Sequence, residues 1–341
     1  MIGRNRVGVA DSVKGLAIIL VVFGHVAQGA EHRGWWSGPS FGEVDAFIYA
    51  FHMPAFFFVA GLFFGQSLES RGLRRFLVDK FKTVLYPYLV FLVPGCLAAA
   101  IGVEASGRHP LIQYALDATT GRASWFLYSL FLVLVLAALL RKVPVVWKLL
   151  GAAALSWLWR DTGAQGLDGA FHEAVFLFAG ELVGSRNLVL LARMGRLIAG
   201  ATALALFSAV FVVTKALGPL QPASPAFVSC GLLGTAGLFM TAQASSRSPV
   251  DRWLQWIGVA SLSVFLLHPF IQGIAMMALL HTGVGHTLGV ELAVPTVLAV
   301  ILPAVIWHRR KRLRVAWLFA LPTQARARPD SNALAVASET A

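Results

Sequence analysis

The chain has 341 residues, of which 57% are hydrophobic and only 13% are charged. Soluble globular proteins carry about 25% charged residues, so this composition excludes a soluble domain and predicts a polytopic membrane protein. The formal net charge of +12 would suggest a nucleic-acid partner in a soluble chain. Here the basic residues cluster between hydrophobic segments, so membrane topology explains them and no nucleic acid is expected. Cys96 and Cys230 lie in apolar runs, which predicts buried small hydrophobes without a disulfide framework.

Continuous apolar segments follow one another along the chain. They cover residues 12–30, 44–65, 84–103, 124–140, 143–160, 171–185, 194–214, 224–243, 253–280 and 290–307. Membrane strands alternate apolar and polar residues, whereas these runs are apolar throughout, so the predicted class is all-α. We therefore predict about ten transmembrane helices in one membrane domain over residues 1–320. Residues 321–341, rich in Ala, Arg and Ser, predict a disordered cytoplasmic tail.

Lysine and arginine predict the orientation of the segments, because cytoplasmic loops carry an excess of both. If the amino terminus is cytoplasmic, the inner loops hold most of the basic residues, including Arg71, Arg74, Arg75, Lys80, Lys82 and the run 309–312. The outer loops then keep Arg33, Arg108, Arg122, Arg160 and Lys215. An even number of spans places both termini in the cytoplasm. No internal repeat is visible by eye, which weighs mildly against secondary-transporter folds.

The first segment contains two ionisable residues, Lys14 at its entrance and His25 deep inside. Their separation returns to the same helix face, with roughly 16 Å between them along the axis. Asp11 lies near that face and can bond to Lys14. Alone, Lys14 would be a snorkelling anchor and His25 a neutral imidazole satisfied by another helix. Together they predict a polar track and a functional site. The run 27–29 resembles a signal-peptide cleavage site, but the histidine and the later segments argue against cleavage.

Three further segments carry ionisable residues at a similar depth, namely His52, Glu173 and His268. With His25 they lie roughly 18–21 Å from the predicted cytoplasmic ends of their helices. His52 and His268 stand near prolines, where a side chain can serve a freed carbonyl, and Glu173 can lie at the outer interface. A layer of three histidines and a glutamate nevertheless indicates a site.

The chemistry open to this layer follows from imidazole. A neutral imidazole can take a proton from an alcohol near pH 7, or act as a nucleophile that carries an acyl group. The same groups can form the proton relay of a transporter or exporter. No two of the histidines lie at i, i+4 on one helix, so no metal is expected.

Several motifs occur in a fixed order along the chain. They are Lys14-x10-His25, Phe51-His-Met-Pro-Ala-Phe-Phe-Phe-Val-Ala-Gly61, Trp125-Phe-Leu-Tyr-Ser-Leu-Phe131, Phe176-Leu-Phe-Ala-Gly180 and the run from Trp256 to Phe270. This ordered set, over about residues 1–320, resembles the type 3 membrane acyltransferases. Members of that family move acetyl or other acyl groups from cytoplasmic coenzyme A to sugars of bacterial surface polymers.

The resemblance implies roles for individual residues. It implies that His25 is the essential catalytic residue, that Lys14 is the basic residue at the inner mouth, and that the protein lies in the inner membrane. It further implies that the basic residues after the second segment bind the acyl-CoA donor, namely Arg71, Arg74, Arg75, Lys80 and Lys82. Arg71 and Arg74 have the family's paired spacing, yet Lys80 and Lys82 lie closer to Pro87, so both pairs stay open. Glu173 is counted with His25 and Lys14 among the catalytic candidates, and whether it or Asp11 orients His25 stays open.

The residues support the same reading independently. Coenzyme A phosphates favour Lys and Arg at the cytoplasmic mouth, from which the acyl arm meets Lys14 and then His25. The sugar acceptor approaches from outside, where Trp35 either stacks on it or belongs to an interfacial aromatic belt. His52, His268 and Trp125 are assigned to the same acceptor side. The main hypothesis is an acyl-CoA-dependent acyltransferase surrounded by membrane lipid. The alternatives are a proton-coupled transporter and a non-catalytic scaffold.

Overall fold

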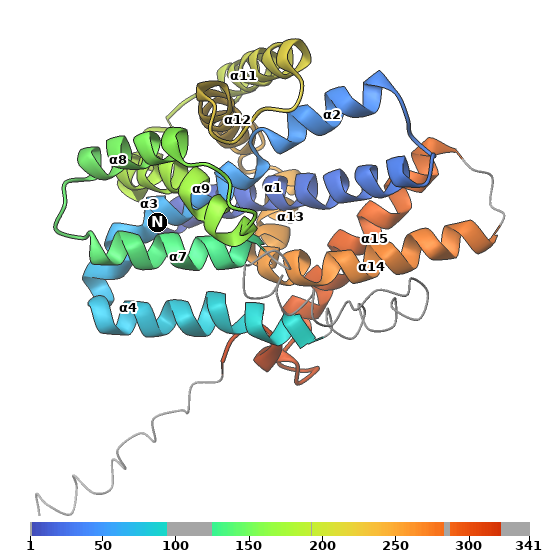
Figure 1. Cartoon of the computed structure of the whole chain (residues 1–341). Helices are drawn as coiled ribbons and strands as arrows, with labels where there is room; N and C mark the ends of the chain where they lie inside the picture. Colours follow the sequence, from blue (N-terminus) through green and yellow to red (C-terminus); the bar gives the residue numbers. More distant parts are fainter. Residues whose placement is uncertain (1, 94–124, 192, 283–286, 322–341) are drawn as a thin grey trace, which may run out of the picture.

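The computed structural model describes residues 2–93, 125–191, 193–282 and 287–321, and every regular element in these ranges is helical (Figure 1). In chain order the elements are α1 (Ile2–His32), α2 (Pro39–Tyr49), α3 (His52–Arg71), α4 (Leu73–Lys80), the π-helix η1 (Phe81–Leu85), α7 (Trp125–Leu139), α8 (Val145–Leu158), α9 (Gln165–Val183), the 3-10 turn η3 (Ser185–Asn187), α10 (Leu188–Leu191), α11 (Arg196–Leu217), α12 (Pro225–Ala244), α13 (Pro249–Val259), α14 (Ser261–Thr282), α15 (Leu288–Arg309) and the 3-10 turn η4 (Ala316–Leu318). The predicted all-α class is confirmed.

Within the described ranges, six helical stretches are long and apolar enough to cross a membrane. They are Gly8–His32, Pro39–Arg71, Arg196–Leu217, Pro225–Ala244, Ser261–His281 and Leu288–Arg309, and α7 and α8 are shorter apolar helices. The chain is therefore a multi-pass membrane protein, as its sequence indicates. The predicted count of ten spans and the cytoplasmic placement of both termini go beyond this finding and stay predictions.

Two of the predicted segments are divided by breaks. The segment 44–65 consists of α2 and α3, with a short turn between them. Pro54 explains this break, because its ring would clash with the carbonyl of Ala50 four positions earlier and it has no N–H to bond there. The segment 253–280 likewise divides at Ala260 into α13 and α14. Continuous hydropathy therefore concealed two places where the chain changes direction.

Part of the prediction falls outside the described residues. The segment 84–103 is helical as far as Val93, and its remainder lies outside the description together with Cys96. The predicted cytoplasmic tail also lies outside it from residue 322 onward. Cys230 is buried in α12, as the sequence predicts for a small hydrophobic side chain.

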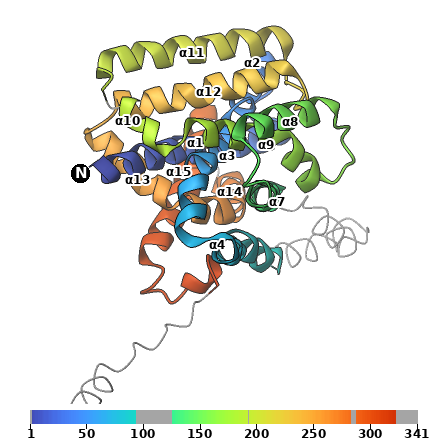
Figure 2. The same ribbon diagram turned by 90° about the vertical axis from the view of Figure 1, so that its left-hand side faces the viewer.

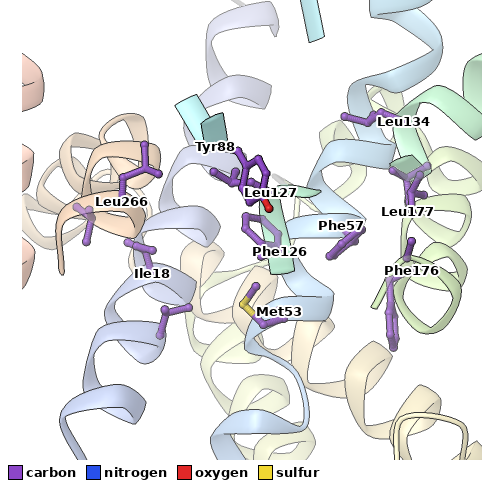
Figure 3. Close-up of a cluster of buried hydrophobic side chains, with 14 of the residues drawn as sticks. Ile18, Met53, Phe57, Tyr88, Phe126, Leu127, Leu134, Phe176, Leu177 and Leu266 are labelled. Carbon is purple, nitrogen blue, oxygen red and sulfur yellow. The ribbon is translucent and has the colours of Figure 1, made fainter. Parts of the chain in front are cut away.

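Helix α1 lies in the middle of the bundle and contacts α2, α3, α12, α13, α14 and α15 (Figures 1 and 2). The interior contains the apolar cluster shown in Figure 3, which includes Phe57 of α3 and Phe126 of α7. The ring of Phe126 packs against those of Phe57 and Phe265, with centroid separations of 5.5 and 5.0 Å. Phe265 lies on α14 three residues before His268, so this packing supports the helix that carries one of the predicted site residues.

Two pairs of helices approach so closely that no side chain fits between them. A Cβ atom on Gly61 of α3 would overlap the carbonyl of Leu177 in α9, and one on Gly180 of α9 would overlap the carbonyl of Phe58. At Gly258 of α13 the backbone of α1 approaches in the same way. Small residues allow membrane helices to pack backbone against backbone. These contacts fix the positions of α9 and α13 relative to the helices that carry His52 and Lys14.

We expect Gly180→Ala to lower the melting temperature of the purified protein, because overpacking a tight contact costs about 1–3 kcal/mol. The control is Gly151→Ala in α8, where an added Cβ meets only open space. That change should leave the melting temperature unchanged or raise it slightly, since alanine favours a helix over glycine. Thermal unfolding in detergent measures both, and equal melting temperatures for the two variants would contradict the close α3–α9 contact.

Candidate active site

Four side chains from three regions of the sequence lie close together around His25 of α1. The ring of His25, on α1, stacks on that of His268, on α14, with centroids 5.2 Å apart and planes inclined by 29°. Tyr49, at the end of α2, stands edge-on to His25 at 6.2 Å and to His52, at the start of α3, at 4.7 Å. We call these residues the His25 cluster. The structure thus brings the three histidines of the predicted layer together, around a tyrosine that the sequence analysis did not single out.

The nitrogen atoms of the cluster have different partners. Nδ1 of His52 lies 2.7 Å from the carbonyl oxygen of Ile48, and Nδ1 of His268 lies 2.8 Å from that of Phe265. A neutral imidazole must donate its proton in these bonds, which leaves Nε2 as the acceptor. Pro269 cannot donate to the Phe265 carbonyl, so His268 serves the carbonyl that proline frees. Nδ1 of His25 instead faces the Tyr49 hydroxyl at 3.4 Å.

These bonds determine which histidine of the cluster can exchange a proton through Nδ1. His52 and His268 both commit Nδ1 to the backbone, whereas the Nδ1 partner of His25 is a hydroxyl group that can either donate or accept a proton. Nε2 of His268 is buried and has no hydrogen-bond partner among the described residues. A buried nitrogen without a partner is costly, so this side of the cluster is suited to a polar ligand.

Lys14 lies on the same uninterrupted helix as His25, nearer the amino terminus. Its Nζ atom is 2.7 Å from Oδ1 of Asp11, which is the local pair that the sequence predicts. Asp11 is about 21 Å along the helix from His25, at 1.5 Å per residue, so it cannot be the carboxylate that orients this histidine. Ser12 donates a hydrogen bond of 2.6 Å to Asp251 of α13, which fixes α13 beside Lys14.

A pocket of about 490 Å³ lies next to the His25 cluster. Its described lining includes Tyr49, Met53, Trp125, His172, Glu173 and Phe227. We call this space the Glu173 pocket. Tyr49 belongs both to the lining of the pocket and to the His25 cluster, so its side chain lies between the two. Trp35, which the sequence analysis also assigned to the acceptor, is not part of this lining and lies against Arg33 at the end of α1.

The acidic residues of the pocket differ in their bonding. Oδ1 of Asp168 accepts hydrogen bonds from Nε1 of Trp159 and from the hydroxyl of Thr162, both at 2.9 Å. Asp161 pairs with Nε2 of His172 at 2.8 Å. Glu173 is only 4% exposed, and its Oε2 atom has no hydrogen-bond partner among the described residues. The pocket therefore contains one carboxylate that is buried and still able to accept a hydrogen bond.

The basic residues predicted to bind the donor lie on or beside α4: Arg71, Arg74, Arg75, Lys80 and Lys82. The junction of α3 with α4 lies at the same end of the bundle as the amino terminus (Figure 1). Arg71 forms an ion pair with Asp79. Lys80 is half-buried, with Nζ 5.3 Å from the ring centroid of Phe76. Burial lowers the pKa of the Lys80 amino group, and the charge of Asp79 opposes that effect in part.

Sequence reasoning missed Tyr49, Asp161 and His172. Tyr49 lies three residues before His52, in the aromatic run Phe47-Ile-Tyr-Ala-Phe51. Its polar hydroxyl was the available signal, since a tyrosine inside a membrane segment needs a hydrogen-bond partner. Asp161 and His172 are eleven residues apart and meet because the chain turns back between α8 and α9. No local pattern in the sequence indicates such a pair.

Comparison with known proteins decides the family. A family model described as an acyltransferase domain matches residues 9–308. The chain belongs to the type 3 membrane acyltransferase family. Over 89 residues this acyltransferase is 35% identical to nodulation protein NolL of Sinorhizobium fredii (strain NBRC 101917 / NGR234). That match covers 25% of the acyltransferase and 23% of the relative, so the two are similar over about a quarter of each chain. No solved structure matches the acyltransferase.

We expect Tyr49→Phe to lower the turnover of the acyltransferase by at least about tenfold, because it removes the hydroxyl group that faces Nδ1 of His25. The ring is retained, so packing against His52 should persist and the protein should fold normally. Tyr128→Phe in α7 is the matched control, since that ring packs on Tyr88 outside the cluster. The measurement is acyl transfer in membranes, with the product detected by mass spectrometry. Full turnover of both variants would contradict a role for the Tyr49 hydroxyl group.

Proposed function

We propose that this acyltransferase moves an acyl group, acetyl in the simplest case, from cytoplasmic acyl-CoA to a hydroxyl of a cell-surface or exported glycan at the inner membrane. One arrangement supports the proposal most directly. Nδ1 of His25 faces the hydroxyl of Tyr49, and Tyr49 also lines the Glu173 pocket. The imidazole therefore lies one side chain away from a space that an acceptor can enter.

The donor side of the proposal rests on charge. Coenzyme A carries phosphate groups, which bind lysine and arginine. The α3–α4 junction and the amino-terminal end of α1 share one end of the bundle (Figure 1), and the positive-inside rule assigns that end to the cytoplasm. We assign to the donor Lys14, Arg71, Arg74, Arg75, Lys80 and Lys82. Which basic pair holds the phosphates stays open between Arg71 with Arg74 and Lys80 with Lys82.

The reaction exchanges a thioester for an oxygen ester. The acceptor oxygen attacks the thioester carbonyl, a C–O bond forms, and the C–S bond breaks. His25, directly or through Tyr49, takes the hydroxyl proton and passes it to the departing coenzyme A thiolate. In the second route His25 first carries the acyl group, and the thiol leaves before the acceptor is acylated. Both routes require His25 as a neutral imidazole.

The acceptor side comprises the remaining residues of the site. His268 stacks on His25, His52 packs on Tyr49, and Trp125 lines the pocket. Glu173, first considered as a catalytic carboxylate, lines the same pocket and is available to an acceptor hydroxyl. Trp35 lies at the turn after α1, which faces outside in the predicted orientation.

The transporter alternative fits this geometry less well. A proton relay needs groups that pass protons along a chain, yet His52 and His268 both commit Nδ1 to backbone carbonyls. Membership of an acyltransferase family also favours transfer chemistry over transport.

We expect His25→Ala to reduce acyl transfer from labelled acetyl-CoA to glycan by about 100-fold or more, the loss typical of a missing general base. His281→Ala is the matched control, since that exposed histidine has, among the described residues, a hydrogen bond to the Met277 carbonyl of its own helix. Transfer is measured in membranes by mass spectrometry of the glycan, at equal protein levels. Undiminished turnover of a folded His25→Ala protein would exclude His25 as base or acyl carrier.

The lowered pKa of Lys80 predicts a pH effect on donor binding. A lysine with a lowered pKa loses its charge at a lower pH than an ordinary lysine, so the KM for acetyl-CoA should rise over a pH range that begins below the ordinary lysine pKa of about 10.4. Lys80→Arg keeps its charge throughout this range and should flatten the profile. Initial rates at several donor concentrations and pH values provide the test. Identical profiles for the two proteins would assign the phosphates to another basic residue.

A further inference from the structure

We propose that the Glu173 pocket binds the acceptor as a sugar ring without negative charge, and that its carboxylates discriminate against acidic sugars. This inference rests on the proposed function, because it takes the acceptor to be a glycan and names its class. It is carried by the size of the pocket, its charge, and one buried carboxylate oxygen without a partner.

The dimensions of the pocket suit a sugar residue. Its volume of about 490 Å³ lies in the range of about 300–1,000 Å³ that is usual for small-molecule sites. Trp125 forms one wall and is held against α9 at Gly169, where an added Cβ would lie 2.7 Å from the indole ring. An indole fixed in this way offers an apolar face, and the C–H face of a sugar ring can pack on it.

The charge of the pocket argues against an anionic ligand. Asp161, Asp168 and Glu173 all line it, and its described lining includes neither lysine nor arginine. The one basic side chain in that lining, His172, is already paired with Asp161. A carboxylate on the acceptor ring would therefore lie near the like charges of Asp161 and Asp168, and the described lining offers no lysine or arginine to pair with it, which is unfavourable.

Glu173 supplies the positive part of the recognition. Its Oε2 atom is buried without a hydrogen-bond donor, and such a group is costly unless a ligand or water completes it. A sugar hydroxyl is a suitable partner, because it can donate to a carboxyl oxygen and can accept from a carboxyl O–H. A hydroxyl held there leaves the rest of the ring within the space that Tyr49 also lines. Binding at Glu173 thus orients the acceptor toward His25.

The test measures sugar binding without any donor, by saturation-transfer NMR on the full chain in lipid nanodiscs. The probes are matched pairs of methyl glycosides: glucoside with glucuronide, galactoside with galacturonide, and mannoside with mannuronide. Each pair differs only at C6. The variants are Glu173→Gln, which keeps the shape of the side chain, and Asp161→Asn, whose carboxylate is 62% exposed and tolerates change. Glu69→Gln is the control, since that exposed carboxylate lies near the end of α3 that joins α4.

We expect at least one neutral glycoside to bind, and each uronide to bind at least about tenfold more weakly than its neutral partner. Glu173→Gln should weaken binding of the neutral glycoside about tenfold, the value of one hydrogen bond, because an amide NH2 group replaces one of the two carboxyl oxygens. Asp161→Asn should reduce the difference in affinity between the neutral glycoside and the uronide of a pair. Glu69→Gln should leave both affinities unchanged. Absence of binding by every neutral glycoside, or equal binding of both members of a pair, would overturn the proposal.

The results distinguish a failure of the proposed sugar pocket from a failure of the proposed reaction. If the sugar binds as expected but no acyl group is transferred from acetyl-CoA, the proposed function is contradicted. The assignment of the Glu173 pocket to a neutral sugar would still hold. Transfer to a neutral glycan that Glu173→Gln and Asp161→Asn leave unchanged, together with unchanged binding, would place the acceptor elsewhere and leave the reaction standing.

Discussion

The contact between His25 and Tyr49 is the interaction on which the site depends. A polar ring inside a membrane protein needs partners, and the histidines of the cluster find two kinds of partner. His52 and His268 bond to backbone carbonyls, which fixes their orientation, while His25 faces a hydroxyl group. The first two histidines therefore hold the geometry, and the third keeps a nitrogen whose proton can be exchanged.

Close helix packing turns this contact into a site. The break between α2 and α3, which Pro54 causes, places Tyr49 and His52 side by side, because one helix ends where the other begins. Gly61 and Gly180 then bring the backbones of α3 and α9 together. Since Glu173 lies on α9, the same packing places its carboxylate in a pocket that shares Tyr49 with the cluster. Two small residues and one proline thus determine how close the Glu173 pocket lies to His25.

The sequence predicted those features that depend on hydrophobicity and helical rise. The helical class and the Asp11–Lys14 pair follow from composition and from the i, i+3 spacing on a helix, whereas the depth of the three histidines in the membrane stays a prediction. What it missed depends on tertiary approach: the pairing of His172 with Asp161 requires the turn between α8 and α9. Breaks inside continuous apolar runs were also missed, because hydropathy averages over the proline that causes one of them.

The two sides of the site carry opposite charge. Lysine and arginine gather by the α3–α4 junction, whereas the Glu173 pocket is lined by carboxylates. In the proposed reaction this polarity sorts the substrates before any specific contact forms. The phosphates of coenzyme A are attracted to the basic end and repelled from the acidic pocket, so donor and acceptor cannot exchange places. An uncharged sugar meets no such field and is held by hydrogen bonds alone. In that reaction the donor and the acceptor therefore occupy different sides of His25.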